Sequence, residues 1–233
     1  MIILLQDDSP FPPAELAQRT PNGLLAAGGS LTSARLLDAY RQGIFPWFSA
    51  DDPILWWSPD PRMVLFPGEF RISRSLRKTL RSRIFEIRTD TAFVQVMRQC
   101  AAPRAGQSGT WIHEEMIEAY TVLHHLGHAH SVEAWKDGEL VGGLYGVAIG
   151  RMFCGESMFS RHSDASKVAF ARLAAQLQLW NFGMIDCQMN TAHLATLGAR
   201  EIPRTEYLRR LQELVNYADI VSPWRFDQHE FIA

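Results

Sequence analysis

The sequence predicts an α+β fold in two parts, with a boundary near residue 61. Its 233 residues are 47% apolar and 21% charged, a globular balance in a chain long enough for one large domain or two smaller ones. Residues 44–61 are rich in proline and tryptophan. Because proline fixes φ and removes amide donors, this stretch predicts a shaped loop and not a helix. Beyond the loop, patterns typical of helices and strands alternate.

The part before the boundary is predicted to hold a strand and a short helix. Residues 1–5 are apolar with no basic segment before them, so they predict a strand and not a secretory leader. Apolar residues at helical spacing predict a helix near 36–40, which Thr32 or Ser33 could cap.

The part after the boundary is predicted to hold a three-stranded β-meander and a long helix. Alternation through 129–159 is interrupted by turns at Asp137-Gly138 and Ile149-Gly150. The helix at 163–181 has one apolar face. The other predicted strands are 63–66, 85–88 and 184–188, and the other predicted helices are 73–81, 91–102, 112–126, 190–197 and 205–216. A meander, a long helix, a strand and a helix in this order are typical of GNAT-like acyltransferases.

Composition narrows the class of protein. The net charge of −2 provides no overall basic field, so any nucleic-acid site must be a local patch. No apolar run approaches the roughly 18 residues that a membrane helix needs. Three cysteines, an odd number without a leader, favour free thiols in a reducing, cytoplasmic compartment. No heptad repeat or hydrophobic arm is visible, so a monomer is expected.

One local patch is strongly basic. Residues 71–88 hold seven Arg or Lys against Glu86 alone, a local charge of +6 that leaves −8 for the rest of the chain. Four basic residues at helical spacing form a stripe suited to a phosphate backbone, although a solvated helix face is the alternative. These four are Arg74, Arg77, Lys78 and Arg81.

Two carboxylates are candidates for chemistry. On a strand, Asp186 and Gln188 would share a face with Cys187 opposite, and the pair could orient an incoming amine or merely pin a strand end to a loop. Glu156 lies in an apolar strand, where alternation places it on one face with Cys154 and Met158. A buried Glu needs a partner, so it predicts either a structural ion pair or a site for a cationic group.

Metal, thiol and nucleotide sites are not predicted. His124 and His128 have i, i+4 spacing, but Gly127 ends the helix between them, so packing or surface histidines are expected. Neither Cys154 nor Cys187 lies in a recognisable nucleophile frame. The chain has no P-loop and no GxGxxG, and the loop 160–167 lacks the glycine-rich cradle that a CoA enzyme would need.

Long motifs carry a resemblance to the leucyl/phenylalanyl-tRNA–protein transferase family. They are ordered as in that family over about residues 11–210 and are tryptophan-rich, and therefore specific. The motifs are Pro21-Asn-Gly-Leu-Leu-Ala-Ala-Gly-Gly29, Gly43-Ile-Phe-Pro-Trp-Phe48, Pro53-Ile-Leu-Trp-Trp-Ser-Pro-Asp-Pro-Arg62, Gly109-Thr-Trp-Ile112, Leu126-Gly-His-Ala-His-Ser131, Leu140-Val-Gly-Gly143, Phe153-Cys-Gly-Glu-Ser-Met-Phe-Ser160, Asp186-Cys-Gln188 and Leu197-Gly-Ala199.

The resemblance implies a small N-terminal α+β domain, 1–61, and a GNAT-like acyltransferase domain, 62–233. It implies transfer of Leu, Phe or Met from aminoacyl-tRNA to proteins that begin with Arg or Lys, which then enter the N-degron pathway. It implies no metal and no cofactor.

The resemblance also implies roles for individual residues. Asp186 and Gln188 match a catalytic pair, Glu156 a residue near the acceptor amine, and Trp47 and Trp111 aromatic residues near the terminal adenosine and aminoacyl group. The implied apolar pocket comprises Leu144, Phe153, Met158, Phe170, Leu173, Leu177 and Ile185.

Three alternative functions remain. An acyl-CoA-dependent N-acyltransferase on the same fold is opposed by the missing pyrophosphate cradle. A tRNA-dependent peptidoglycan-bridge transferase would usually need two such domains, for which 233 residues are few. A non-catalytic tRNA-binding adaptor would keep the basic stripe and would need neither Asp186 nor Glu156.

Overall fold

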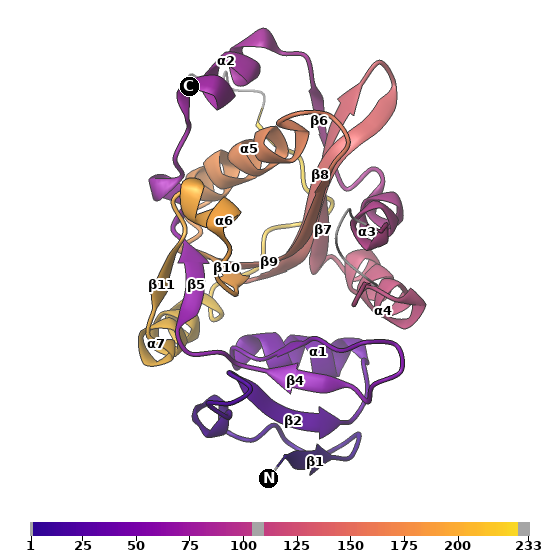
Figure 1. The fold of residues 1–233 in the computed structure, drawn as a ribbon, viewed down its shortest axis with the longest axis vertical. Helices are drawn as coiled ribbons and strands as arrows, with labels where there is room; N and C mark the ends of the chain where they lie inside the picture. Colours follow the sequence, from indigo (N-terminus) through magenta and orange to yellow (C-terminus); the bar gives the residue numbers. More distant parts are fainter. Residues whose placement is uncertain (1, 104–109, 228–233) are drawn as a thin grey trace.

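Two β-sheets organise the protein, as the computed structural model of residues 2–103 and 110–227 shows (Figure 1). Met1, in the first predicted strand, and Gly109, in one of the quoted motifs, lie outside the described residues. The first sheet has the order β1-β2-β4-β3 and the second the order β11-β5-β10-β9-β8-β7-β6. The chain passes from the first sheet to the second between Trp57 and Arg62, and the mixed α+β class is confirmed.

The first sheet is small and is covered by one helix. Its strands are β1 (Ile3–Leu5), β2 (Leu24–Gly28), β3 (Phe45–Pro46) and β4 (Leu55–Trp57), and a 3-10 turn, η1 (Ala14–Leu16), precedes β2. Helix α1 (Ser33–Arg41) begins where it was predicted, because the Thr32 hydroxyl accepts a hydrogen bond from the Arg35 amide. The segment 44–61, predicted to be a loop, contains the two short strands β3 and β4. Strand β2 was not predicted, because its residues are nearly all buried and show no alternation of apolar and polar side chains.

The second sheet follows the predicted order of elements. Its meander is β7 (Ala129–Lys136), β8 (Glu139–Ile149) and β9 (Met152–Ser160), and the other strands are β5 (Arg62–Leu65), β6 (Glu86–Thr89), β10 (Met184–Gln188) and β11 (Arg200–Ile202). Strand β10 pairs with β9 in parallel and with β5 antiparallel. The three-residue strand β11 was not predicted, since it is too short to show a pattern.

Helices cover both faces of this sheet (Figure 1). The long helix α5 (Ala165–Leu179) packs on one face, and α3 (Phe93–Ala101) and α4 (Glu114–His125) pack on the other. The remaining helical elements are η2 (Pro67–Glu69), α2 (Arg74–Ser82), α6 (Ala192–Thr196) and α7 (Arg204–Leu214). None of the helices in the described part of the chain is long and apolar enough to cross a membrane.

Strand β9 departs from the predicted alternation. Tyr145 pairs with Ser157 and Gly146 pairs with Gly155, so Glu156 is an extra residue in a β-bulge. The bulge reverses the side-chain order beyond it: Cys154 belongs to the core under α3 and α4, whereas Met158 packs on the α5 side. The prediction that Cys154 and Met158 share a face is therefore wrong.

Candidate active site

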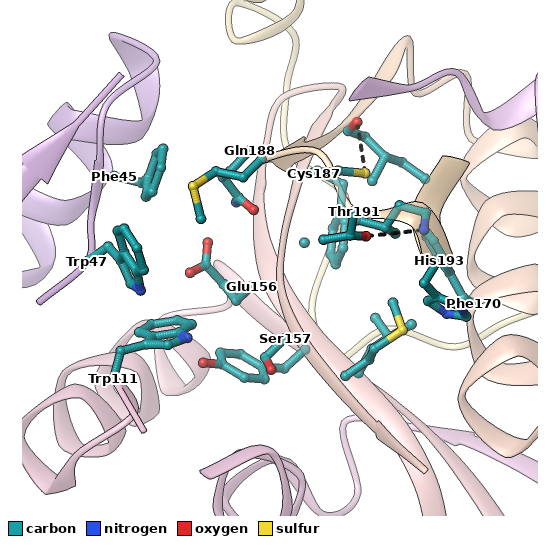
Figure 2. A pocket seen from close by; sticks show the side chains of 18 of the residues that line it. Phe45, Trp47, Trp111, Glu156, Ser157, Phe170, Cys187, Gln188, Thr191 and His193 are labelled. Carbon is teal, nitrogen blue, oxygen red and sulfur yellow. Dashed lines mark hydrogen bonds between the residues drawn. The ribbon is translucent and has the colours of Figure 1, made fainter. Parts of the chain in front are cut away.

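A cavity of about 360 Å³ opens where β9, β10 and the segment after α1 meet. Figure 2 shows Trp47 and Trp111 on one side of it, Phe170 and His193 on the other, and Glu156 with Gln188 between them. Its lining comprises Phe45, Pro46, Trp47, Trp111, Leu144, Tyr145, Phe153, Gly155, Glu156, Ser157, Met158, Phe170, Ile185, Cys187, Gln188, Met189, Thr191, His193 and Leu194. Both parts of the chain thus contribute to one cavity.

The inner end of the cavity is apolar. Five of the seven residues expected there do line it, from β8, β9, α5 and β10; they are Leu144, Phe153, Met158, Phe170 and Ile185. Leu173 and Leu177 are fully buried in the core and do not belong to the lining. This is a correction to the expected pocket. Helical spacing places Phe170, Leu173 and Leu177 on one face of α5, but it cannot distinguish a residue that lines the cavity from one buried in the core beneath it.

Gln188 reaches the cavity because the end of β10 is distorted. Its φ of +56° lies in the left-handed region, and the pairing of β10 with β5 shifts register between Asp186 and Gln188. Its backbone N–H donates to Asp186 Oδ1 over 2.9 Å. The side-chain Nε2 is buried and has no protein partner. A buried donor without a partner is costly, so this amide is available to a ligand.

Asp186 lies behind Gln188 and not on the cavity wall. Its two carboxylate oxygens accept hydrogen bonds from Arg62, Nε to Oδ1 at 2.8 Å and Nη2 to Oδ2 at 2.6 Å. Tyr207 donates a third at 3.0 Å. Asp186 is completely buried and Arg62 is 1% exposed. The prediction that Asp186 and Gln188 share a face with Cys187 opposite is therefore wrong, because Cys187 and Gln188 both line the cavity and Asp186 does not.

The charges of Arg62 and Asp186 compensate each other within the buried ion pair. Burial alone would lower the pKa of Arg62, but the nearby Asp186 carboxylate outweighs burial and holds that pKa above its usual range. Arg62 also donates to the Gly43 carbonyl and lies over the rings of Phe45 and Tyr207. Such a pair fixes geometry, since each charge is compensated where it stands.

Glu156 is held differently, by two tyrosine hydroxyls. Tyr40 of α1 donates to Oε1 over 2.7 Å and Tyr120 of α4 donates to Oε2 over 3.2 Å. Burial raises the pKa of Glu156 to about 7; the Tyr40 hydrogen bond opposes this shift, and the Asp186 charge adds to it. Glu156 therefore changes charge near neutral pH.

The contacts among Tyr40, Tyr120 and Glu156 indicate how many protons these three groups share. The Tyr40 and Tyr120 hydroxyls contact one another as well as Glu156, which makes three contacts among three groups. Two tyrosines supply only two protons, because each hydroxyl donates one hydrogen bond. Burial raises the pKa of both tyrosines well above the usual value, so neither loses its proton near neutral pH. When Glu156 is protonated, its carboxyl donates to one tyrosine and that tyrosine then donates to the other, so each of the three contacts contains one proton.

The two tryptophans form the outer wall. Trp47 packs edge-to-face on Trp57 with ring centroids 5.3 Å apart, and the Trp57 indole N–H donates to the Trp47 carbonyl. Trp111 lines the same side of the cavity. Both are partly exposed, so each presents a flat apolar face to a ligand.

The basic residues of α2 do not line the cavity. This helix lies at the opposite end of the molecule from the first sheet (Figure 1). The side chains of all four residues of the predicted stripe are exposed: Arg74, Arg77, Lys78 and Arg81. They form a surface separate from the cavity.

The histidines and cysteines have structural surroundings. Within residues 2–103 and 110–227, no cluster of three or more His, Cys, Asp or Glu could hold a metal ion. His124 contacts the Ala129 carbonyl, and His130 contacts Asp90. Cys187 lines the cavity, but burial raises the pKa of its thiol far above the usual value, so it is a poor nucleophile.

The sequence did not reveal the groups that hold the two carboxylates. Arg62 has one available signal: a cation that opens the apolar strand β5 requires a buried partner. Tyr40 and Tyr120 have no such signal, because a tyrosine on the apolar face of a helix is typical of a core. Tyr145 also reaches the cavity, with a buried hydroxyl that has no protein partner.

Comparisons with known proteins agree with the motifs. The family model described as leucyl/phenylalanyl-tRNA protein transferase matches residues 64–212, and the model of its N-terminal domain matches residues 29–60. A relative from Nitrosospira multiformis is 64% identical over 230 residues, 99% of each chain. One from Nitrosomonas europaea is 63% identical over 97% of this chain and 96% of that one. Both are named leucyl/phenylalanyl-tRNA–protein transferase.

Solved structures show only a distant likeness. L-PGS from Bacillus licheniformis has a TM-score of 0.39 at 10% identity, covering 68% of this chain and 51% of that one. A GCN5-related N-acetyltransferase from Kribbella flavida has a TM-score of 0.33 at 11% identity, covering 71% and 59%.

Proposed function

Because the chain belongs to the leucyl/phenylalanyl-tRNA–protein transferase family, we propose that it transfers Leu, Phe or Met from aminoacyl-tRNA to the N-terminal α-amine of proteins that begin with Arg or Lys. The observation that carries this proposal is the apolar cavity whose wall bears Glu156 and the unpartnered amide of Gln188. The products enter the N-degron pathway in the cytoplasm. The enzyme works as a monomer, with residues 1–61 and the GNAT-like residues 62–233 as its two domains.

The aminoacyl side chain occupies the inner end of the cavity. An apolar wall favours Leu, Phe and Met because a polar side chain would lose its hydrogen bonds to water there. It discriminates weakly among apolar side chains, by about 1–3 kcal/mol per methylene. Trp47 and Trp111, on the outer side, offer stacking faces to the terminal adenosine.

The chemistry needs positioning more than activation. The aminoacyl ester is already reactive, and an α-amine with a pKa of about 8 is neutral in roughly a tenth of molecules at pH 7. Holding amine and ester together at the cavity lowers the barrier by removing the entropy cost of their encounter. The ribose hydroxyl of the tRNA relays the proton that the amine loses.

Gln188 orients the reacting groups. An amide oxygen binds protons too weakly to act as a base, so it accepts a hydrogen bond from the attacking amine. The Nε2 group, buried without a protein partner, donates to the ester carbonyl oxygen, where negative charge develops.

Asp186 is a positioning residue in this scheme. Its carboxylate anchors the Gln188 backbone while two N–H groups of Arg62 balance its charge. Glu156 faces the cavity and, when ionised, attracts the cationic N-terminus of the acceptor.

A single assay tests this function. The protein is incubated with labelled Leu-tRNA and a peptide that begins with Arg, and the peptide extended by leucine is expected. The same peptide with an N-terminal Ser is the matched control. Transfer of label from acetyl-CoA, with none from Leu-tRNA, would establish the acyl-CoA alternative. Binding of tRNA without transfer would establish the adaptor, and transfer only to a peptidoglycan precursor would establish the third alternative.

The exposed basic residues of α2 are proposed to bind the tRNA backbone. Because each neutralised phosphate releases counterions, Arg77→Ala should weaken tRNA binding and make the negative slope of log K against log [salt] shallower by about 0.7–0.9. Arg209→Ala removes an exposed arginine from α7 and is the matched control. An unchanged slope in Arg77→Ala would exclude this surface.

A further inference from the structure

The last described residues, 215–227, form neither a helix nor a strand, yet they bury a large aromatic side chain. Trp224 is 2% exposed. An irregular segment usually runs over the surface with its side chains in solvent, so an indole buried from such a segment requires a specific seat. The motifs of the sequence do not extend to this segment.

The site that holds Trp224 is formed by β6, β7 and Asp90, the residue that follows β6. The backbone N–H of Trp224 donates to Asp90 Oδ2 over 2.8 Å, and its carbonyl accepts from the Thr89 hydroxyl over 2.6 Å. The indole stacks on His130 with ring centroids 3.8 Å apart and planes 5° apart. Asp90 Oδ2 also contacts His130 Nδ1 at 2.9 Å. Trp224 is therefore held both by hydrogen bonds to its backbone and by stacking on its ring.

The seated indole lies behind the cavity. Its ring centroid is 5.8 Å from that of Phe153, a residue of the cavity lining. Trp180 and Phe182 pack on it at 5.2 and 6.2 Å. Phe153 thus has the cavity on one side and the aromatic cluster of the C-terminal segment on another.

Phe153 has little freedom in a further direction. An added Cβ at Gly146 of β8 would lie only 2.5 Å from Phe153 Cζ, so the ring rests against bare backbone there. Phe153 is 1% exposed. The Gly146 backbone and Trp224 therefore both restrict where the Phe153 ring can lie.

We propose that Trp224 is a positioning residue that sets the depth of the cavity through Phe153, and thereby the largest aminoacyl side chain that the enzyme transfers. This rests on the proposed function, because it takes the cavity as the aminoacyl site. Removing the indole leaves a void behind Phe153; the ring moves into the void and the cavity deepens. The C-terminal segment, which touches no substrate, then determines selectivity.

The test measures selectivity in Trp224→Ala and Trp224→Phe. Rates of transfer to a peptide beginning with Arg are compared for tRNAs that carry leucine, phenylalanine or the larger tryptophan. Trp224→Ala should raise the kcat/KM ratio of tryptophan to leucine about tenfold, the scale on which an apolar pocket discriminates by size. Trp224→Phe, which keeps an aromatic ring in the seat, should shift the ratio in the same direction by less. Unchanged ratios in both variants would overturn the proposal.

A double-mutant cycle separates this role from a general loss of structure. If Trp224 acts through Phe153, Trp224→Ala should no longer change the ratio in a Phe153→Leu background. Equal shifts in both backgrounds would overturn the proposal. If Phe153→Leu alone left the ratio unchanged, the cavity would not be the aminoacyl site and this proposal would be overturned, whereas a wild type that transferred none of the three amino acids would contradict the proposed function itself.

Trp180→Phe provides the matched control. It alters the same aromatic cluster, in which Trp180 packs on Trp224 and Phe226. It should lower the thermal midpoint without changing the ratio of tryptophan to leucine. A shift as large as that of Trp224→Ala would attribute selectivity to loosening of the cluster and would overturn the proposal.

Discussion

Two carboxylates on adjacent strands, Asp186 on β10 and Glu156 on β9, have opposite surroundings. Asp186 is fully buried and is paired by two hydrogen bonds with the Arg62 guanidinium. Glu156 reaches the cavity wall and receives only the neutral hydroxyls of Tyr40 and Tyr120. One carboxylate is thus hydrogen-bonded to a cation and the other to neutral hydroxyls.

This difference bears on the protonation of Glu156. An adjacent cation compensates a buried carboxylate, whereas hydroxyl donors compensate it only in part, so Glu156 has a pKa raised to about 7. Asp186 is suited to hold a neighbouring backbone in place. Glu156 is suited to gain or lose charge when a cationic group arrives.

The largest expected effect is that of Asp186→Asn. It leaves the Arg62 guanidinium buried without its counter-charge, which should cost about 3–5 kcal/mol of unfolding free energy. It also weakens the anchor of Gln188, and a misplaced catalytic group costs about 100-fold in rate. Urea unfolding and single-turnover kinetics measure the two effects. A variant with a near-normal rate constant would contradict the positioning role.

Glu69→Gln is the matched control for this buried pair. It breaks an ion pair with Arg200 in which both side chains are 50% exposed. Such surface pairs contribute about 0–1 kcal/mol, so little change in unfolding free energy is expected.

Glu156→Gln should have the next largest effect, on pH dependence. Under the proposed function, ionised Glu156 attracts the acceptor in the wild type, so the KM for the peptide should fall as pH rises through about 7. In the variant that limb should disappear, and the KM above pH 7 should rise about tenfold, equivalent to 1.4 kcal/mol. Initial rates between about pH 6 and about 8 measure it, and titration of the acceptor amine affects both proteins equally. An identical pH profile would assign the limb to another group.

The stability of the wild type should change with pH in a defined direction that Glu156→Gln abolishes. Because the pKa of Glu156 is raised when folded, the folded chain keeps a proton that the unfolded chain loses between pH 4.5 and about 7. The wild type should therefore lose up to about 3 kcal/mol of stability from this group as pH rises through that window. Glu156→Gln should lack this contribution, as unfolding at both ends of the window would show.

A smaller effect is expected from Tyr40→Phe and Tyr120→Phe. Each removes a hydrogen bond that lowers the pKa of Glu156, so each should move the activity limb to higher pH. Tyr40→Phe should move it further, because its hydrogen bond is the shorter of the two. The pH profile of KM distinguishes the two variants, and a shift to lower pH would contradict the assignment.

The smallest effect is expected from Cys187→Ala, between the two catalytic candidates in sequence. The thiol lines the cavity, but burial raises its pKa so far that thiolate is negligible near neutral pH. The kcat should stay within about threefold of the wild type, the scale of a mutation that removes no catalytic interaction. A much larger loss of kcat in Cys187→Ala would show that the thiol contributes to the reaction.

Local signals predicted the helices and the meander. The Thr32 cap, the tight turn at Asp137-Gly138 and the apolar face of α5 are each determined by residues close in sequence. The bulge at Glu156 was not predictable, because one extra residue in β9 becomes evident only from its pairing with β8. That single residue changed which side chains share a face.

The polar residues that line the cavity could be predicted from the sequence, but the groups that hold them in place could not. Gln188 and Glu156 stand out as polar residues in apolar strands. Arg62 is 124 positions from Asp186, and Tyr40 is 116 from Glu156. No periodicity connects residues so far apart. Leu173 and Leu177 illustrate the same limit, since core and cavity positions on α5 share one spacing.

The hydroxyl of Tyr40 links the two parts of the chain, and this link has a consequence for exchanging those parts between relatives. A side chain from α1, packed beside the first sheet, tunes the acidity of a carboxylate on the second. A chimera that joined the first 61 residues of one relative to the remainder of another would recombine halves of a single titrating unit. Such an exchange would preserve the pKa of Glu156 only if the donated helix placed a hydroxyl at the same point.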